Sequence, residues 1–139
     1  MIEAKNYLLQ VERLDSRIDN KLIERQQWRD IALGITANIG GERVQSSGSQ
    51  QKMSEAIEKC LDMENEIDSL IDELIETKKK VIDTIEKIYS PTEYKILHMR
   101  YIQHISLKEI AIKLNREYSW VTTTHGRALK SVQNILDGV

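Results

Sequence analysis

Four side chains that can form hydrogen bonds with DNA bases stand close together near the end of the chain: Tyr118, Ser119, Thr122 and Thr123. A hydroxyl group can donate to or accept from base edges in the major groove, and a threonine methyl group can contact the methyl group of thymine. Because two adjacent β-branched polar residues weaken a helix, contact with DNA explains Thr122 and Thr123 better than helix formation does. This spacing predicts a surface that reads double-stranded DNA.

Cations that can hold the DNA backbone lie around these residues. Lys and Arg side chains bind phosphate groups and orient a protein on DNA without specifying sequence. The candidates for phosphate contacts are Lys108, Arg116, Arg127 and Lys130. Trp120 has two interpretations that stay open, contact with DNA or closure of a small core at the turn. His125 is interpreted as a core residue rather than as a reader of bases.

Residues for other kinds of chemistry are scattered. The histidines share no metal-ligand spacing with one another or with the single cysteine: His98, His104, His125 and Cys60. Gly40 and Gly41 are not followed by the Lys and Ser or Thr of a phosphate-binding loop. We therefore expect no enzyme, no catalytic residue, no metal site and no cofactor.

Three short helices are predicted to position the candidate DNA surface, over residues 92–103, 107–114 and 118–136. Ser90-Pro91-Thr92-Glu93 and Ser106-Leu107-Lys108-Glu109 both have the pattern of a capping box, in which a Ser side chain accepts from a free backbone N–H. Asn115 readily adopts the left-handed conformation that ends a helix. Apolar residues at helical spacing give each helix a buried face, so these helices are predicted to form a helix-turn-helix unit.

Two long helices are predicted before this unit, at about residues 2–33 and 50–89. The second has a heptad seam, with Glu64 and Lys78 as seam-edge charges or as residues that fix register: Ile57, Cys60, Glu64, Ile67, Ile71, Leu74, Lys78, Val81, Ile85 and Ile88. A polar loop at about residues 34–50 lets the helices pair antiparallel. The prediction is an all-α fold, with a helical hairpin over residues 1–89 and the helix-turn-helix domain over residues 90–139.

Composition and charge support this division. Residues 1–89 carry 13 Lys and Arg against 18 Asp and Glu, whereas residues 90–139 carry 7 against 4. The basic excess of the second segment is small, so individual DNA contacts are expected to be weak and sensitive to salt. A homodimer through the long helices would double them, although the hairpin could also pair only within one chain. No signal peptide and no apolar run of about 20 residues is visible, so we expect a cytoplasmic protein without membrane contact.

The C-terminal segment resembles the promoter-reading domain of bacterial sigma factors, known as region four. The resemblance rests on residues 94–101, on Ser106-Leu107-Lys108-Glu109-Ile110-Ala111, on Val121 and on Arg127-Ala128-Leu129-Lys130. Trp120-Val121 followed by His125-Gly126-Arg127-Ala128-Leu129 is more specifically similar to phage late-transcription regulators of the ArpU and RinA kind. That similarity implies a DNA-binding regulator whose base-reading positions are Tyr118, Ser119, Thr122 and Thr123. It also implies phosphate contacts from Lys108, Arg127 and Lys130.

Two departures from the sigma pattern limit what can be transferred. Arg116 stands where an apolar residue is usual, and Glu117 stands where a Ser or Thr cap is usual. The arginines with which sigma factors read DNA are missing, so the target sequence of those factors is not carried over. Two other functions remain open: a DNA-binding packaging protein like a small terminase subunit, and an adaptor whose C-terminal unit binds RNA polymerase.

Overall fold

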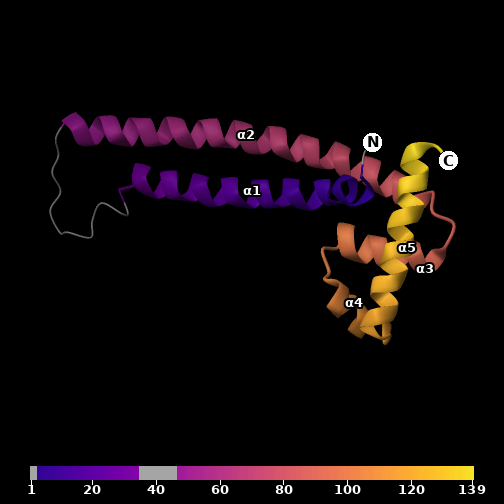
Figure 1. Cartoon of the computed structure of the whole chain (residues 1–139). Coiled ribbons are helices and arrows are strands. Elements are labelled where there is room, and N and C mark those ends of the chain that lie inside the picture. Colours follow the sequence, from indigo (N-terminus) through magenta and orange to yellow (C-terminus); the bar gives the residue numbers. More distant parts are fainter. Residues whose placement is uncertain (1–2, 35–46) are drawn as a thin grey trace. The chain divides into compact units, whose positions relative to one another are not determined.

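The computed structural model describes residues 3–34 and 47–139, and these residues form helices without a β-strand. The elements are α1 (Ala4–Ala32), α2 (Ser47–Glu86), α3 (Pro91–Leu97), the π-helical turn η2 (His98–Ile102), α4 (Leu107–Leu114) and α5 (Tyr118–Asp137). Figure 1 shows α1 and α2 side by side and running in opposite directions. The predicted fold class, a long helical hairpin followed by shorter helices, is confirmed. Most of the loop predicted at residues 34–50 lies outside the described residues.

The chain divides into two compact units. We name Met1–Asp15 together with Leu74–Val139 the head unit, and Ser16–Glu73 the hairpin unit. The domain boundary predicted at residue 90 concerns which segment folds by itself, and it stays a prediction. Across the part of the chain that the structure describes, no helix is long and apolar enough to cross a membrane.

The larger hydrophobic core of the head unit joins the start of α1 and the end of α2 to the C-terminal helices. Its buried side chains are Ala4, Leu8, Val11, Val81, Ile85, Leu97, Tyr101, Ala128 and Val132. Polar contacts accompany it: the Gln133 Oε1 atom accepts from the backbone N–H of Ala4 at 2.8 Å, and the Arg100 guanidinium lies 3.4 Å from the Glu12 carboxylate. The first turns of α1 therefore belong to the structure that holds α5.

A second, smaller core lies within the C-terminal helices. It contains Ile96 from α3, Met99 from η2, Ile110 and Ala111 from α4, and Val121 from α5. The segment formed by α3 and η2 thus contributes to both cores of the head unit. Sequence periodicity predicted one buried side for this segment, whereas the structure buries residues on two sides of it.

The hairpin unit has a single narrow seam between α1 and α2. Its most deeply buried side chains are Ala56, Ile67 and Leu70 on α2, with Ile18 on α1. An ion pair of 3.0 Å joins Lys21 Nζ to Glu66 Oε2 along one edge of this seam. Two helices can cover only one stripe of each other, so most side chains of this unit stay at its surface.

One of the two lines of the predicted heptad seam of α2 was wrong at Ile57 and Ile71 but right at Ile85, which is completely buried in the head unit. Ile57 is 51% exposed and Ile71 is 38% exposed. Glu64 and Lys78 are exposed too, which agrees with their interpretation as seam-edge charges. The neighbouring line, one residue earlier in each heptad, faces inward instead, with Ala56 and Leu70 buried. A small residue such as Ala56 carries little hydrophobic signal, whereas isoleucines at heptad spacing carry a strong one. Sequence periodicity therefore selected the wrong edge of the seam.

Candidate nucleic-acid interface

Two kinds of local signal, a serine cap at the start of a helix and a left-handed asparagine at its end, mark the ends of α3 and α4. The Ser90 and Ser106 hydroxyls accept from the backbone N–H groups of Glu93 and Glu109, at 3.3 and 3.2 Å. Asn115 ends α4 in the left-handed conformation, with a φ of 53°. These three expectations are confirmed: Ser90 and Ser106 mark the starts of α3 and α4, and Asn115 sets the short turn between α4 and α5. The Glu93 carboxylate accepts from the Ser131 hydroxyl at 2.6 Å, so it also links α3 to α5.

The helix α5 has a buried side and an exposed side along its length. Val121, Thr124, Ala128 and Val132 are buried against the two cores. At about 100° per residue, the opposite line of α5 consists of four of the predicted site residues: Ser119, Thr123, Arg127 and Lys130. All four are exposed. The structure thus brings two of the four predicted base-reading residues and two predicted phosphate-binding cations onto one continuous line.

The other predicted readers lie beside this line. Tyr118 is 47% exposed at the first position of α5. Thr122 is half-buried, and its hydroxyl donates to the backbone carbonyl oxygen of Ser119 at 3.0 Å. That hydroxyl can still accept a hydrogen bond from a base through its free lone pair. Thr123 is therefore the better placed of the two adjacent threonines.

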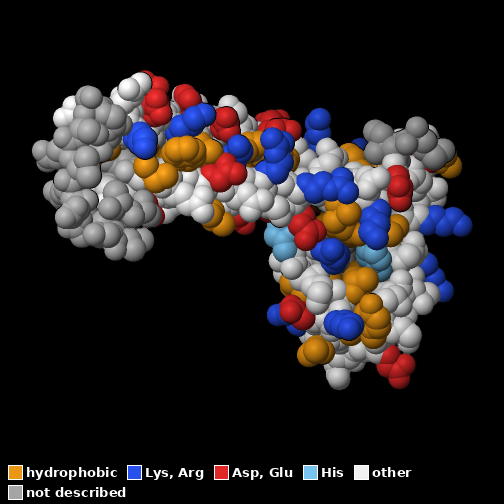
Figure 2. Space-filling view, turned by 60° about the vertical axis from the view of Figure 1, so that its left-hand side comes forward, with side chains coloured by type: hydrophobic (Ala, Val, Ile, Leu, Met, Phe, Trp, Pro, Cys, Tyr) orange, Lys and Arg blue, Asp and Glu red, His pale blue; other side chains and the backbone are white. Residues whose placement is uncertain are grey.

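The predicted cations differ in their surroundings. Within the described residues, no ion pair joins Lys108, Arg127 or Lys130 to a carboxylate, and all three are exposed. Arg116 is also exposed, and its guanidinium lies over the Trp120 ring, 4.6 Å from the ring centroid. Figure 2 shows Lys and Arg side chains at several points on the surface of the head unit. None of the four predicted cations forms an ion pair within the described residues, and Arg116 alone among them has a cation–π contact.

Trp120 packs against the smaller core of the head unit. It is half-buried beside the cluster that contains Ile110 and Val121. The cation–π contact holds Arg116 on its outer surface. Of the two interpretations that the sequence left open for Trp120, the structure supports core packing.

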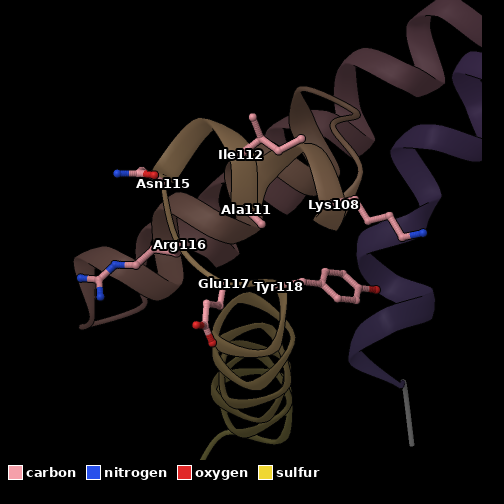
Figure 3. A pocket seen from close by; sticks show the side chains of 7 residues that line it. All are labelled: Lys108, Ala111, Ile112, Asn115, Arg116, Glu117 and Tyr118. Carbon is pink, nitrogen blue, oxygen red and sulfur yellow. The ribbon is translucent and has the colours of Figure 1, made fainter.

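A shallow hollow of about 580 Å³ lies beside the start of α5. It is lined by Lys108, Ala111, Ile112, Asn115, Arg116, Glu117 and Tyr118. Figure 3 shows Lys108 and Tyr118 extending toward one side of this hollow, and Asn115 and Arg116 toward the other. Ile112 is 79% exposed here and was not predicted as a site residue. Its only sequence signal is an isoleucine outside the apolar face of α4.

Glu117 precedes α5 without capping it through its side chain. The carboxylate is exposed at the rim of the hollow, close to the predicted readers. Its negative charge would repel a DNA phosphate group at this point. Among the predicted cations, Lys108 and Arg116 line the same hollow, so charges of both signs lie beside the start of α5.

His125 belongs to the interior of the head unit. Its Nε2 atom lies 2.7 Å from the Tyr101 hydroxyl, and the two rings stack with centroids 5.7 Å apart. Burial lowers the pKa of His125 below its ordinary value of 6.5, and the positive charges of Arg100 and Lys5 lower it further. Burial also raises the pKa of Tyr101. His125 is thus a neutral packing residue near pH 7, as the sequence indicated.

The described residues also limit other kinds of site. Within residues 3–34 and 47–139, no three His, Cys, Asp or Glu side chains are grouped so that they could hold a metal ion. The three histidines make separate contacts: His98 with Gln103, His104 with Asp15 and His125 with Tyr101. The predicted site residues of α5 thus present hydrogen-bonding groups and positive charge on a helix surface.

Comparison with known proteins gives one match. No curated protein and no solved structure matches the chain. A family described as a protein of unknown function, DUF1492, matches residues 37–136, a span that covers α2 to α5 and leaves out α1. Because this match includes most of the sequence, the chain belongs to the DUF1492 family.

Proposed function

We propose that this chain is a sequence-specific DNA-binding transcription regulator of phage origin, akin to the ArpU and RinA activators, that places the first half of α5 in the major groove. The observation that carries the proposal is the exposed line of Ser119, Thr123, Arg127 and Lys130 on α5, opposite its buried side. A recognition helix needs this arrangement, since hydroxyls at its front reach base edges while cations behind them reach phosphate groups.

The proposal assigns different roles to the two halves of the line. Ser119 and Thr123, with Tyr118 and Thr122 beside them, would contact bases. Arg127 and Lys130 would contact the DNA backbone, together with Lys108 from α4 and the Arg116 guanidinium on Trp120. These roles need no catalytic step and no cofactor, and they place the protein in the cytoplasm of a host bacterium. The Glu117 carboxylate would face away from phosphate groups.

The test is selection of bound oligonucleotides from a random double-stranded pool, followed by fluorescence-anisotropy titration. We expect one enriched motif, bound at least about 100-fold more tightly than unrelated DNA. The double variant Thr122→Ala/Thr123→Ala should bring binding of that motif close to the level of unrelated DNA, because it removes two hydroxyls and two methyl groups from the reading surface.

The matched control for the double threonine variant is a substitution away from the exposed line of α5. The variant Ser54→Ala removes an exposed hydroxyl of the hairpin unit and should leave the preference for the motif unchanged. If the double threonine variant selects the same motif with the same affinity as the parent chain, the reading role assigned to α5 is wrong.

A second function, an adaptor that binds RNA polymerase through the head unit, is favoured by the hollow beside α5. Ile112 and Tyr118 expose apolar surface there, whereas interfaces with DNA are strongly polar and positively charged. If the chain is an adaptor, Ile112→Lys should abolish its capture of RNA polymerase, and the random pool of oligonucleotides should yield no motif. The regulator predicts an enriched motif for the Ile112→Lys variant as well.

A further inference from the structure

One side of the hairpin unit carries large apolar side chains that the described residues leave uncovered. On α2, Met53, Ile57, Leu61 and Ile71 are 42%, 51%, 56% and 38% exposed. On α1, Leu22 and Leu33 are 37% and 64% exposed. Figure 2 shows hydrophobic side chains at the surface along the long helices. Large apolar side chains gathered on one side of a protein surface often mark a contact with another protein.

Helix geometry places these residues on the same side of the hairpin. On α2, residues 57, 61, 64, 68 and 71 follow one another at intervals of three or four and form one line beside the seam. On α1, residues 22, 26, 29 and 33 form a similar line. Lys21 and Glu66 pair across the opposite edge of the seam. Because antiparallel helices bring matching edges together, the two lines share the edge that lacks this ion pair.

This apolar edge is separate from the seam that holds the hairpin unit together. The seam buries Ala56, Ile67 and Leu70, whereas Ile57, Leu61 and Ile71 point away from it. A helix with two apolar lines needs two packing partners, and α1 supplies only one. The described residues of the hairpin unit contain no second partner for this edge.

The charges on the apolar edge are complementary to each other. Arg29 lies on the α1 line, and Glu64 and Asp68 lie on the α2 line; all three are exposed. No ion pair engages them within the described residues. Over residues 16–73 the sequence has 7 Lys and Arg against 12 Asp and Glu, so this unit repels DNA and anionic lipid. A protein surface with both signs of charge fits it better.

We propose that the occupant of this edge is the same edge of a second copy of the chain, related by a two-fold axis near Leu61. The contacts of Lys21 with Glu66 and of Cys60 Sγ with the Arg25 carbonyl oxygen fix the register of the hairpin. In that register Arg29 lies on one side of Leu61 along the hairpin axis, and Glu64 and Asp68 lie on the other. A two-fold axis perpendicular to the edge therefore places Arg29 of each copy beside Glu64 and Asp68 of the other, around a shared apolar centre.

The first test compares two substitutions of exposed apolar residues in sedimentation experiments on the full chain. Leu61→Lys puts a charge at the centre of the proposed contact and should weaken self-association at least about 100-fold. Ile23→Lys is the matched control: Ile23 is 59% exposed but lies on the outer side of α1, away from this edge, so its dimer should equal that of the parent. Circular dichroism of both variants should give the helical content of the parent chain.

The second test reverses the charges. A chain with Arg29→Glu and a chain with Glu64→Arg/Asp68→Arg should each self-associate more weakly than the parent, because like charges then meet. Mixing the two chains should restore dimers, since both cross-contacts pair opposite charges again. A parent chain that is monomeric at about 100 µM overturns the proposal. So does a dimer that tolerates Leu61→Lys, a mixture that does not recover, or an assembly larger than a dimer.

Discussion

The head unit and the hairpin unit both contain parts of the long helices α1 and α2, but they bury the apolar side chains of these helices to different extents. In the head unit, Leu8 and Val11 of α1 and Val81 and Ile85 of α2 are completely buried, because α3, η2 and α5 cover what the two helices leave open. Among the described residues of the hairpin unit, only Ala56 reaches this level, and Ile57 and Leu61 are more than half exposed. Two helices alone make a seam, and a full core requires further helices around them.

The largest test of this contrast is to separate the C-terminal helices from the hairpin. A fragment of residues 90–139 keeps Leu97, Tyr101, Ala128 and Val132 but loses the five α1 and α2 residues of the same core. We expect this fragment to show no cooperative thermal transition by circular dichroism, because one face of α3 and α5 would be open to water. A fragment that unfolds cooperatively would establish the domain boundary predicted at residue 90.

The same substitution, leucine to alanine, can be made in each unit, and the two losses of unfolding free energy can be compared. Leu8→Ala empties a completely buried site in the head unit and should cost about 3 to 4 kcal/mol of unfolding free energy. Leu70→Ala removes a side chain that is 7% exposed in a seam between only two helices, which can close more easily, and should cost about 1 to 2 kcal/mol. Urea unfolding measures both losses, and equal losses would contradict the contrast between core and seam.

Cations of the two units should also differ in their effect on DNA binding. The double variant Arg127→Ala/Lys130→Ala removes two proposed phosphate contacts, so the slope of log K against log salt should become shallower by about 1.8. Lys59→Ala removes an exposed cation from the acidic hairpin unit and should leave the slope unchanged. Anisotropy titrations at several salt concentrations measure the slopes, and a similar change for Lys59→Ala would show that binding is not confined to the head unit.

The smallest expected effect concerns pH. The pKa of His125 is lowered in the folded head unit, so below about pH 6.5 the unfolded chain binds a proton that the folded chain resists. The free energy of unfolding should therefore fall as the pH drops from 6.5 toward the lowered pKa, and it should be unaffected by this group above 6.5. The variant His125→Gln should have a flatter profile over that range, and an unchanged slope would assign the pH dependence to other groups.

Local features of the fold could be predicted from the sequence because single residues determine them. Ser90, Ser106 and Asn115 mark helix ends through hydrogen bonds and backbone conformation within a few residues, and the structure has all three. Features that depend on packing between distant segments could not be predicted. The exposure of Ile57 depends on the position of α1, which the sequence does not give. The burial of Ile96 and Met99 depends on a second core formed with α4 and α5.

The same distinction applies to the candidate site. The exposed line on α5 could be predicted, since it is the complement of an apolar pattern within one helix. The hollow with Ile112 could not, because it depends on how α4 approaches the start of α5. Arg116 was predicted as a phosphate contact, but its position over Trp120 depends on the turn between the two helices.

Because η2 is a π-helical turn, the number of residues between α3 and α4 matters to the structure as much as their identity. The Gln103 backbone N–H donates to the His98 carbonyl oxygen, five residues earlier, so this turn holds one residue more than an α-helical turn. Deleting one residue from His98–Ile102 would regularise the helix and rotate its two halves relative to each other by about 100°. Relatives of this chain should thus vary in side chains here far more readily than in residue number, and an insertion or deletion would mark a differently assembled head.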